Sequence, residues 1–189
     1  MVKKIFFFYF IINLFNYLYA NPYKIIVTIN NNPITQIDLD NEVKILSILN
    51  KKKSSEIGKS NAIDNLIEEI IKSEEIQKEK LSMDDNLINQ NFNQLLKNLN
   101  LNEDTINQNL ILLIKKKIEV DSLWNNLINR KYGWKININI KEIDMQLKKK
   151  YSNDMKENLV FREKNKKLAV FSRYHLNKLK EESLIKFYK

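Results

Sequence analysis

Apolar residues recur at helical spacing through most of the chain, most clearly between positions 60 and 75. Isoleucine and leucine step by three and four residues there, at Ile63, Leu66, Ile67, Ile70 and Ile71. Side chains at this spacing share one face of an α-helix, so the segment predicts an amphipathic helix with that face in the core. Its other face, which carries Glu68, Glu69, Lys72 and Glu75, is expected to face solvent. The whole chain has only two glycines and two prolines, which favours long helices.

The pattern predicts about five or six helices. They cover residues 36–50, the run after Ser60, residues 82–99, residues 102–128, residues 139–151 and residues 160–180. Several starts carry an N-cap residue with an acidic residue three positions later, which satisfies free backbone N–H groups of the first turn. These pairs are Thr35 with Asp38, Ser82 with Asp85, and Asn139 with Glu142. Gly133 is expected to end the fourth helix.

Two short runs of β-compatible residues lie at opposite ends of this helical region, at residues 24–29 and 184–188. The first is followed by an asparagine-rich turn that Pro33 closes. An isolated strand is not stable, because its backbone groups need a partner. We therefore predict that the two strands pair. The predicted fold class is mostly α: a helical bundle with a small β ribbon that joins the N- and C-terminal strands.

Residues 1–20 have the three zones of a secretory signal peptide. Lys3 and Lys4 precede an apolar run over residues 5–12, and the small residue Ala20 suits cleavage just before Asn21. The alternative is an uncleaved membrane anchor, although polar residues keep the apolar run well below the roughly 20 residues that span a bilayer. We predict secretion with cleavage, and no stable membrane insertion of the remaining chain.

Beyond the signal, the pattern predicts one core built from two segments. Residues 21–151 form a helical domain, and residues 152–189 add a helix and a strand to the same core. The formal net charge is +9, of which the two lysines of the signal contribute two and leave +7. The main basic runs are Lys115–Lys117 and Lys148–Lys150. No aromatic residues interleave with them, so we predict solvated helix faces and no nucleic-acid partner.

Residues that catalysis or metal binding requires are scarce. The chain has no cysteine, and its one histidine, His175, has no second ligand at metal-binding spacing. Neighbouring acids such as Glu68 and Glu69 face different sides of a helix, and two distant glycines form no phosphate-binding loop. The sequence therefore predicts no catalytic residue, no metal and no cofactor, and a partly buried or surface position for His175.

Several motifs occur in the order found in the SurA family of periplasmic chaperones. The segment K-I-I-V-T-I-N-N-N-P-I-T-Q-I-D-L-D at residues 24–40 resembles the opening strand, turn and helix start of that family. Residues 62–69, 101–104, 134–144 and 171–187 resemble later segments, so the resemblance extends over nearly the whole chain after the signal. It implies an ATP-independent chaperone of the periplasm whose partners are unfolded outer-membrane proteins or other extended polypeptides.

The chain departs from the family in one respect. SurA relatives usually insert parvulin-type prolyl isomerase domains between the last two segments, where this chain has only residues 152–158. Parvulin sites also use paired histidines, and this chain has a single one. No residue here therefore inherits isomerase activity. Two alternatives to the chaperone remain: a prolyl isomerase of the SurA/parvulin family, and a basic structural or adaptor protein without client binding.

The resemblance also indicates where a client polypeptide would bind. Exposed aromatic residues beside helix faces can hold extended, aromatic-rich segments, which requires apolar patches with adaptable polar surroundings. The candidates are Phe92, Trp124, Tyr132 and Trp134, the last three of which lie near the end of the fourth helix. Packing in the core is expected for at least one of the two tryptophans.

Overall fold

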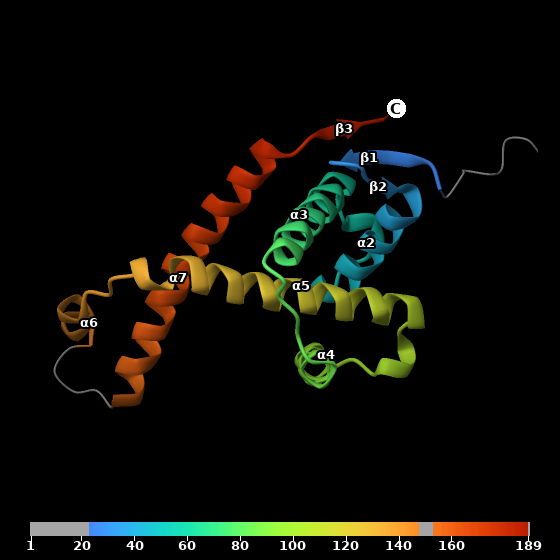
Figure 1. Ribbon diagram of the computed structural model, residues 1–189. Coiled ribbons are helices and arrows are strands. Elements are labelled where there is room, and N and C mark those ends of the chain that lie inside the picture. The colour runs from blue at the N-terminus through green and yellow to red at the C-terminus, as the bar shows by residue number, and fades with distance from the viewer. Residues whose placement is uncertain (1–22, 148–152, 189) are drawn as a thin grey trace, which may run out of the picture.

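A computed structural model of the protein describes residues 23–147 and 153–188. Helices make up most of this part of the chain, and a small antiparallel sheet lies beside them (Figure 1). The predicted fold class is therefore confirmed. The predicted signal peptide and its cleavage site between Ala20 and Asn21 lie outside the described residues. None of the described helices combines the length and the hydropathy that crossing a membrane requires.

The sheet consists of β1 (Ile25–Ile29), β2 (Asn32–Thr35) and β3 (Ile185–Phe187). The helices are α2 (Gln36–Asn50), α3 (Lys59–Lys78), α4 (Asp85–Leu99), α5 (Gln108–Tyr132), α6 (Ile140–Gln146) and α7 (Asn153–Glu182). Short 3-10 turns occur at Ser54–Glu56, Glu103–Thr105 and Gly133–Lys135. In Figure 1, α5 runs through the middle, with α2 and α3 on one side, α4 on the other, and α7 crossing its C-terminal end.

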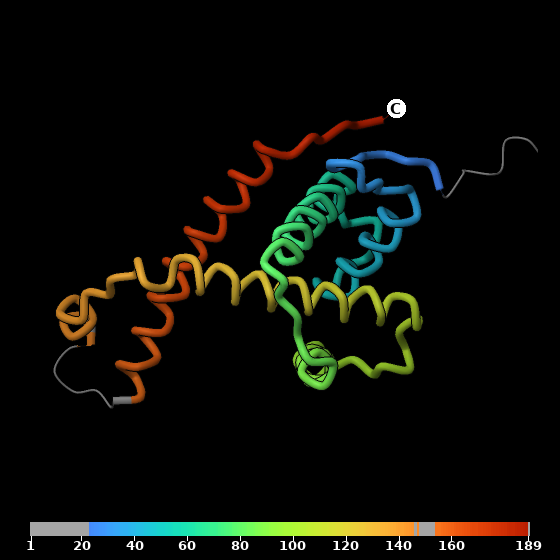
Figure 2. Tube along the Cα trace, in the orientation of Figure 1, coloured from blue at the N-terminus to red at the C-terminus, as the bar shows by residue number. Residues whose placement is uncertain are grey.

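Strands β1 and β3 pair antiparallel although they come from opposite ends of the sequence (Figure 2). Val27 lies opposite Phe187, and Ile29 lies opposite Ile185. The predicted pairing of the N- and C-terminal strands is therefore confirmed. It places β1 in the centre of the sheet, in the order β2-β1-β3.

The sheet contains one strand that the sequence pattern did not predict. Residues 32–35, expected as a turn and a helix cap, form β2 and pair with β1 as a hairpin. Asn30 makes the tight reversal with a φ of 51°, in the left-handed region that asparagine tolerates better than most residues. Pro33 is compatible with β2 because this is an edge strand, where a missing backbone N–H leaves the sheet intact.

The predicted start of α2 is confirmed, and the predicted start of α4 is wrong. Helix α2 begins as predicted, with a capping box in which the Thr35 N–H donates to Asp38 Oδ2 at 2.8 Å and the Asp38 N–H donates to Thr35 Oγ1. Helix α4 does not begin at Ser82. Asp84 is its N-cap instead, since its carboxylate accepts from the Asn86 N–H at 2.7 Å.

Helices α3 and α5 also begin away from their predicted caps. Helix α3 begins at Lys59, directly after Gly58, rather than behind Ser60. Asn102 caps the short 3-10 turn by accepting from the Asp104 N–H, so the predicted start of α5 near Asn102 is wrong. Asn107 provides the actual cap of α5. The Asn102 side chain thus stabilises the 3-10 turn, and the Asn107 side chain determines that α5 starts after it.

The last two helices have other lengths than predicted. Asn139 caps α6 as expected, accepting from the Glu142 N–H, but α6 ends at Gln146 rather than near residue 151. Helix α7 already includes residues 153–158, which were predicted as a polar loop, and extends to Glu182. Gly133 ends α5 as predicted.

Two apolar cores share helix α5. The first lies between the sheet, α3, α7 and the C-terminal half of α5, and its buried residues are Val27, Ile29, Ile34, Ile67, Ile71, Ile76, Val120, Leu123, Trp124, Leu127, Ile128 and Leu176. The second lies between α2, α4 and the N-terminal half of α5, with Ile45, Phe92, Leu96, Ile111 and Ile114. The predicted apolar face of α3 is confirmed, because Ile67 and Ile71 are buried in the first core.

Deleting residues 184–189 is expected to destabilise the whole fold. The deletion removes β3 and its hydrogen bonds to β1, such as that from the Tyr188 N–H to the Ile26 carbonyl, and it uncovers Val27 and Ile29. Because each hydrogen bond contributes about 1 kcal/mol, we expect the free energy of unfolding in urea to fall by at least about 2 kcal/mol. Lys186→Ala, which keeps the backbone, should change it by less than about 0.5 kcal/mol. An unchanged transition in the truncated protein would contradict the role assigned to β3.

Candidate functional site

The aromatic residues predicted to contact a client occupy different environments. Phe92 is 1% exposed in the second core, and Trp124 is 2% exposed and donates from Nε1 to Ser172 Oγ at 2.8 Å. Binding of a client requires an exposed side chain, so the prediction that Phe92 and Trp124 contact a client is wrong. The apolar face of α4 directs Phe92 toward α5, and α7 covers Trp124, which makes both side chains part of the core.

Tyr132 and Trp134 lie together at the C-terminal end of α5. Trp134 is 78% exposed, whereas Tyr132 is half-buried and stacks on Phe171 with 5.0 Å between ring centroids. The Lys135 ammonium lies 5.5 Å from the Tyr132 ring centroid and 5.1 Å from that of Trp134. A cation between two aromatic faces holds them in a defined arrangement. Trp134 is therefore the predicted contact residue that the fold leaves most open to a partner.

Trp134 lies at the start of a projecting unit that we call the arm, made of residues 133–147 and 153–167 (Figure 1). Within the arm, α6 packs against the first half of α7 through Ile143 and an ion pair of 2.6 Å between Lys156 and Asp144. Lys167 of α7 also donates a hydrogen bond to the Asn137 carbonyl in the segment before α6. Large apolar side chains are nevertheless exposed along it, namely Trp134, Ile140, Met145, Met155 and Phe161. The arm thus presents apolar surface on a fixed support.

Sequence reasoning missed Met145, Met155 and Phe161. A signal for Phe161 exists, because it is followed directly by Arg162, Glu163 and Lys164, and an apolar residue in a charged helical run has few apolar neighbours with which to be buried. Met155 likewise lies between Asp154 and Lys156, whereas Met145 has apolar residues two positions away on both sides. A large apolar residue directly beside charged residues is therefore the pattern that would have indicated Phe161 and Met155.

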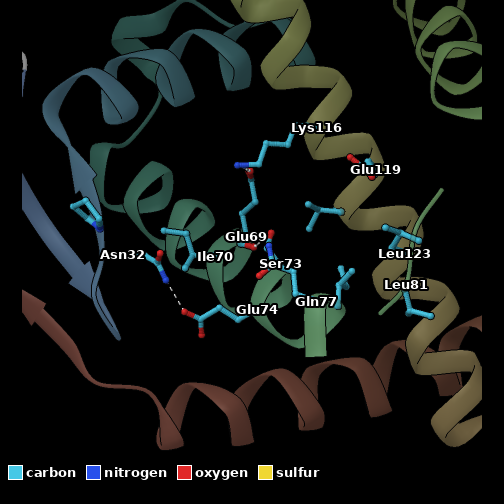
Figure 3. Close-up of a pocket in the computed structure, with 13 residues that line it drawn as sticks. Asn32, Glu69, Ile70, Ser73, Glu74, Gln77, Leu81, Lys116, Glu119 and Leu123 are labelled. Atoms are coloured by element: carbon cyan, nitrogen blue, oxygen red, sulfur yellow. Dashed lines mark hydrogen bonds and ion pairs between the residues drawn. The ribbon is translucent and has the colours of Figure 1, made fainter. Parts of the chain in front are cut away.

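A groove of about 460 Å³ lies between α3, α5 and β2 (Figure 3). We call it the α3–α5 groove. Its apolar lining comes from Pro33, Ile70, Ile76, Leu81, Val120 and Leu123, and its polar lining from Asn32, Glu69, Ser73, Glu74, Gln77, Lys116 and Glu119. The volume lies within the range of small-ligand sites, roughly 300–1,000 Å³. Because three separate segments form the groove, no local sequence pattern predicts it.

A second cavity of about 170 Å³ adjoins this groove. The two share Pro33, Glu69, Ile70 and Lys116 in their linings. The carboxylate of Glu69 lies 3.7 Å from the ammonium of Lys116, so this ion pair stands where the two cavities meet. Together they form an elongated depression rather than a round pocket.

A buried ion pair supports the wall of this depression. Lys117 Nζ lies 3.2 Å from Glu42 Oε1 and 2.9 Å from Glu69 Oε2, and Glu42 is 2% exposed. Burial alone would lower the pKa of Lys117, but the two carboxylates outweigh it and raise that pKa above its ordinary value. Lys117 is therefore charged and ties α5 to α2 and α3.

The polar face of α3 differs from the prediction that it faces solvent. Glu69 pairs with Lys117 of α5, Glu68 with Lys180 of α7, and Glu75 is buried. The basic run of α5 differs too, since Lys116 is exposed as expected but the side chain of Lys117 is only 18% exposed. Neighbouring helices supply opposite charges that no helical periodicity in α3 alone reveals.

His175 is 8% exposed and lies where α7 packs on α3 and α5. Its Nδ1 is 2.9 Å from the Tyr132 hydroxyl, which can donate to it, and its Nε2 is 3.4 Å from Glu75 Oε1. Burial, and next the nearby charge of Lys131, lower the pKa of His175 below its ordinary value, although Glu75 acts in the opposite direction. The imidazole is therefore neutral at pH 7. His175 is thus more buried than the partly buried or surface position predicted for it, because α7 packs it against α3 and α5.

Glu75 completes this cluster. Its carboxylate accepts from Lys131 Nζ at 2.7 Å. Burial raises the pKa of Glu75, but the hydrogen bond and charge of Lys131, followed by the contact with His175, outweigh it, and the net pKa lies below the ordinary value. The carboxylate is therefore ionised at neutral pH and pairs α3 with α5 beneath α7.

Within the described residues, no cluster of histidine and acidic side chains is arranged to hold a metal ion. Comparison of the chain with protein-family models and with curated proteins gives no match. The candidate site therefore consists of what the geometry itself provides: the exposed apolar arm and the elongated α3–α5 groove.

Substituting Lys117→Met should destabilise the protein strongly. It leaves Glu42 buried without its cation, and breaking one partner of a buried pair costs about 3–5 kcal/mol. The free energy of unfolding in urea measures the loss. Lys116→Met is the matched control, because Lys116 is the next residue on α5, is exposed and lies 3.7 Å from Glu69, so less than about 1 kcal/mol is expected. Equal effects of the two substitutions would refute the assigned role of Lys117.

The packing of α7 should weaken in mild acid. The folded-state pKa of His175 lies below its ordinary value of 6.5, so its stabilising effect is complete above pH 6.5 and is lost as pH falls toward the lowered pKa. The effect of Glu75, whose pKa is lowered from 4.5, is lost only at still lower pH. The free energy of unfolding should therefore fall between pH 7 and 5, and less steeply in His175→Gln. An imidazole pKa above 6.5 in an NMR titration would contradict this.

Proposed function

We propose that the protein is an ATP-independent chaperone that holds unfolded outer-membrane proteins in the periplasm. The observation that carries the proposal is the arm, on which five large apolar side chains, including two methionines and two aromatic residues, remain exposed. The order of motifs that resembles the SurA family supports it, and the predicted signal peptide supports the periplasmic location.

The chemistry of the arm suits many ligands rather than one. Methionine is unbranched and polarisable, so its side chain adapts to differently shaped apolar partners. Flexible, methionine-containing surfaces are a feature of binders that accept many sequences. Rigid aromatic side chains such as Trp134 and Phe161 add large contact areas at a low cost in conformational entropy. This combination favours extended segments with exposed apolar residues, which unfolded membrane proteins provide.

Holding requires no chemical step. A protein that binds the unfolded state of a client lowers the concentration of free unfolded chain and so delays its aggregation. Prolyl isomerisation, in contrast, must overcome a barrier of about 20 kcal/mol and requires a dedicated site. Between α6 and α7 this chain has only residues 147–152, where SurA relatives insert an isomerase domain. The proposal therefore does not include isomerase activity.

The purified protein should suppress aggregation of an unfolded β-barrel precursor, followed by light scattering, without ATP. Trp134→Ala together with Phe161→Ala should weaken precursor binding roughly 5- to 30-fold, as expected for loss of about 1–2 kcal/mol at exposed contact residues. Val170→Ala is a matched control, because Val170 is 59% exposed on α7 but lies outside the arm. We also expect no acceleration of proline-limited refolding.

Two outcomes would contradict the proposal. Absence of binding to any unfolded client would favour a structural or adaptor protein. Acceleration of prolyl isomerisation that survives removal of contaminating isomerases would favour an enzyme.

A further inference from the structure

The α3–α5 groove carries an excess of negative charge in a chain whose net charge is +9. Its lining contains three glutamates, Glu69, Glu74 and Glu119, and one lysine, Lys116. The charge of Glu69 is already balanced, because Lys117 and Lys116 lie 2.9 and 3.7 Å from its carboxylate. The other two glutamates therefore decide the electrostatics of the groove.

Neither Glu74 nor Glu119 is paired with a cation in the part of the chain that the structure describes. Glu74 accepts from the neutral amides of Asn30 and Asn32, both at 2.7 Å. Glu119 is half-buried and forms no hydrogen bond or ion pair with any described residue. Figure 3 shows the two carboxylates on different walls, Glu74 on α3 beside β2 and Glu119 on α5. A cation bound in the groove would satisfy charges that the fold leaves unbalanced.

The rest of the lining combines six apolar residues with the neutral polar residues Asn32, Ser73 and Gln77. Ile76, Val120 and Leu123 are buried residues that form its floor between α3 and α5. Past the pair of Glu69 and Lys116, the depression continues into the second cavity. A ligand that fills both cavities is therefore long, partly apolar and positively charged at one point.

We propose that the α3–α5 groove binds an extended peptide segment at a lysine or arginine side chain flanked by apolar residues. This inference rests on the proposed chaperone function, because an unfolded client would supply the peptide segment. It adds to that function a preference for segments with a basic side chain. Nucleic acids and anionic lipid headgroups are poor occupants, because their phosphates would face Glu74 and Glu119.

Fluorescence anisotropy with short labelled peptides tests the preference. In each peptide valine and threonine alternate around one central residue, which is lysine, norleucine or glutamate. The purified protein should bind the lysine peptide about tenfold more tightly than the norleucine peptide and bind the glutamate peptide most weakly. Higher salt should weaken binding of the lysine peptide alone, since the groove is open to solvent.

Glu119→Gln is the decisive variant. Because Glu119 has no partner among the described residues, its substitution should leave thermal unfolding unchanged, while affinity for the lysine peptide falls about three- to tenfold and affinity for the norleucine peptide stays the same. Glu181→Gln, at an exposed position of α7 outside the groove, should change neither affinity. Equal binding of the three peptides, no binding of any, or an unchanged lysine preference in Glu119→Gln would overturn the inference.

The experiment also separates this inference from the proposed function. Variants of the arm should lose suppression of precursor aggregation and keep the preference for lysine peptides. Suppression by the arm without any peptide preference would overturn the groove alone. A dimer that dissociates in Glu119→Lys would show that a second copy of the chain fills the groove, and would likewise overturn the inference.

Discussion

Helix α5 has more apolar surface than a single neighbour can cover, and most of the packing follows from that constraint. Ile111 and Ile114 are buried against α2 and α4, whereas Leu127 and Ile128 are buried against α3, α7 and the sheet. A helix of 25 residues is about 37 Å long, so the two cores lie side by side along it rather than around one centre. The same length places the arm at one end of α5 and α4 near the other.

The sequence predicted those parts of the fold that local interactions determine. The capping box of Thr35 and Asp38 satisfies its own backbone, and the apolar face of α3 follows from helical spacing alone. Pairing of β1 with β3 was predicted because each strand needed a partner. By contrast, β2 forms only by pairing with β1. The starts of α4 and α5 depend on which of several neighbouring polar side chains accepts a hydrogen bond from the first turn of the helix.

The candidate site was predicted less well, because it depends on packing between segments that are distant in the sequence. Trp134 was predicted because aromatic residues cluster near Gly133. The sequence does not show that Trp134 is exposed and Trp124 buried, because that difference depends on where α7 packs. The groove joins β2, α3 and α5, so its walls do not exist in any local segment. Phe161 and Met155, in contrast, combine an apolar side chain with charged sequence neighbours that already indicate exposure.

The sheet has a consequence for when the protein becomes folded. Thr28 and Tyr188 contact each other through their hydroxyl groups although they are 160 positions apart in the sequence. Joining such distant segments is slow, because the entropy of closing the intervening loop is lost before the contact is gained. During synthesis, which proceeds from the N-terminus, β1 has no β3 to pair with until all the helices from α2 to α7 have been made. Completion of the sheet is therefore a late event in folding, and the apolar face of β1 stays without its final cover until β3 arrives.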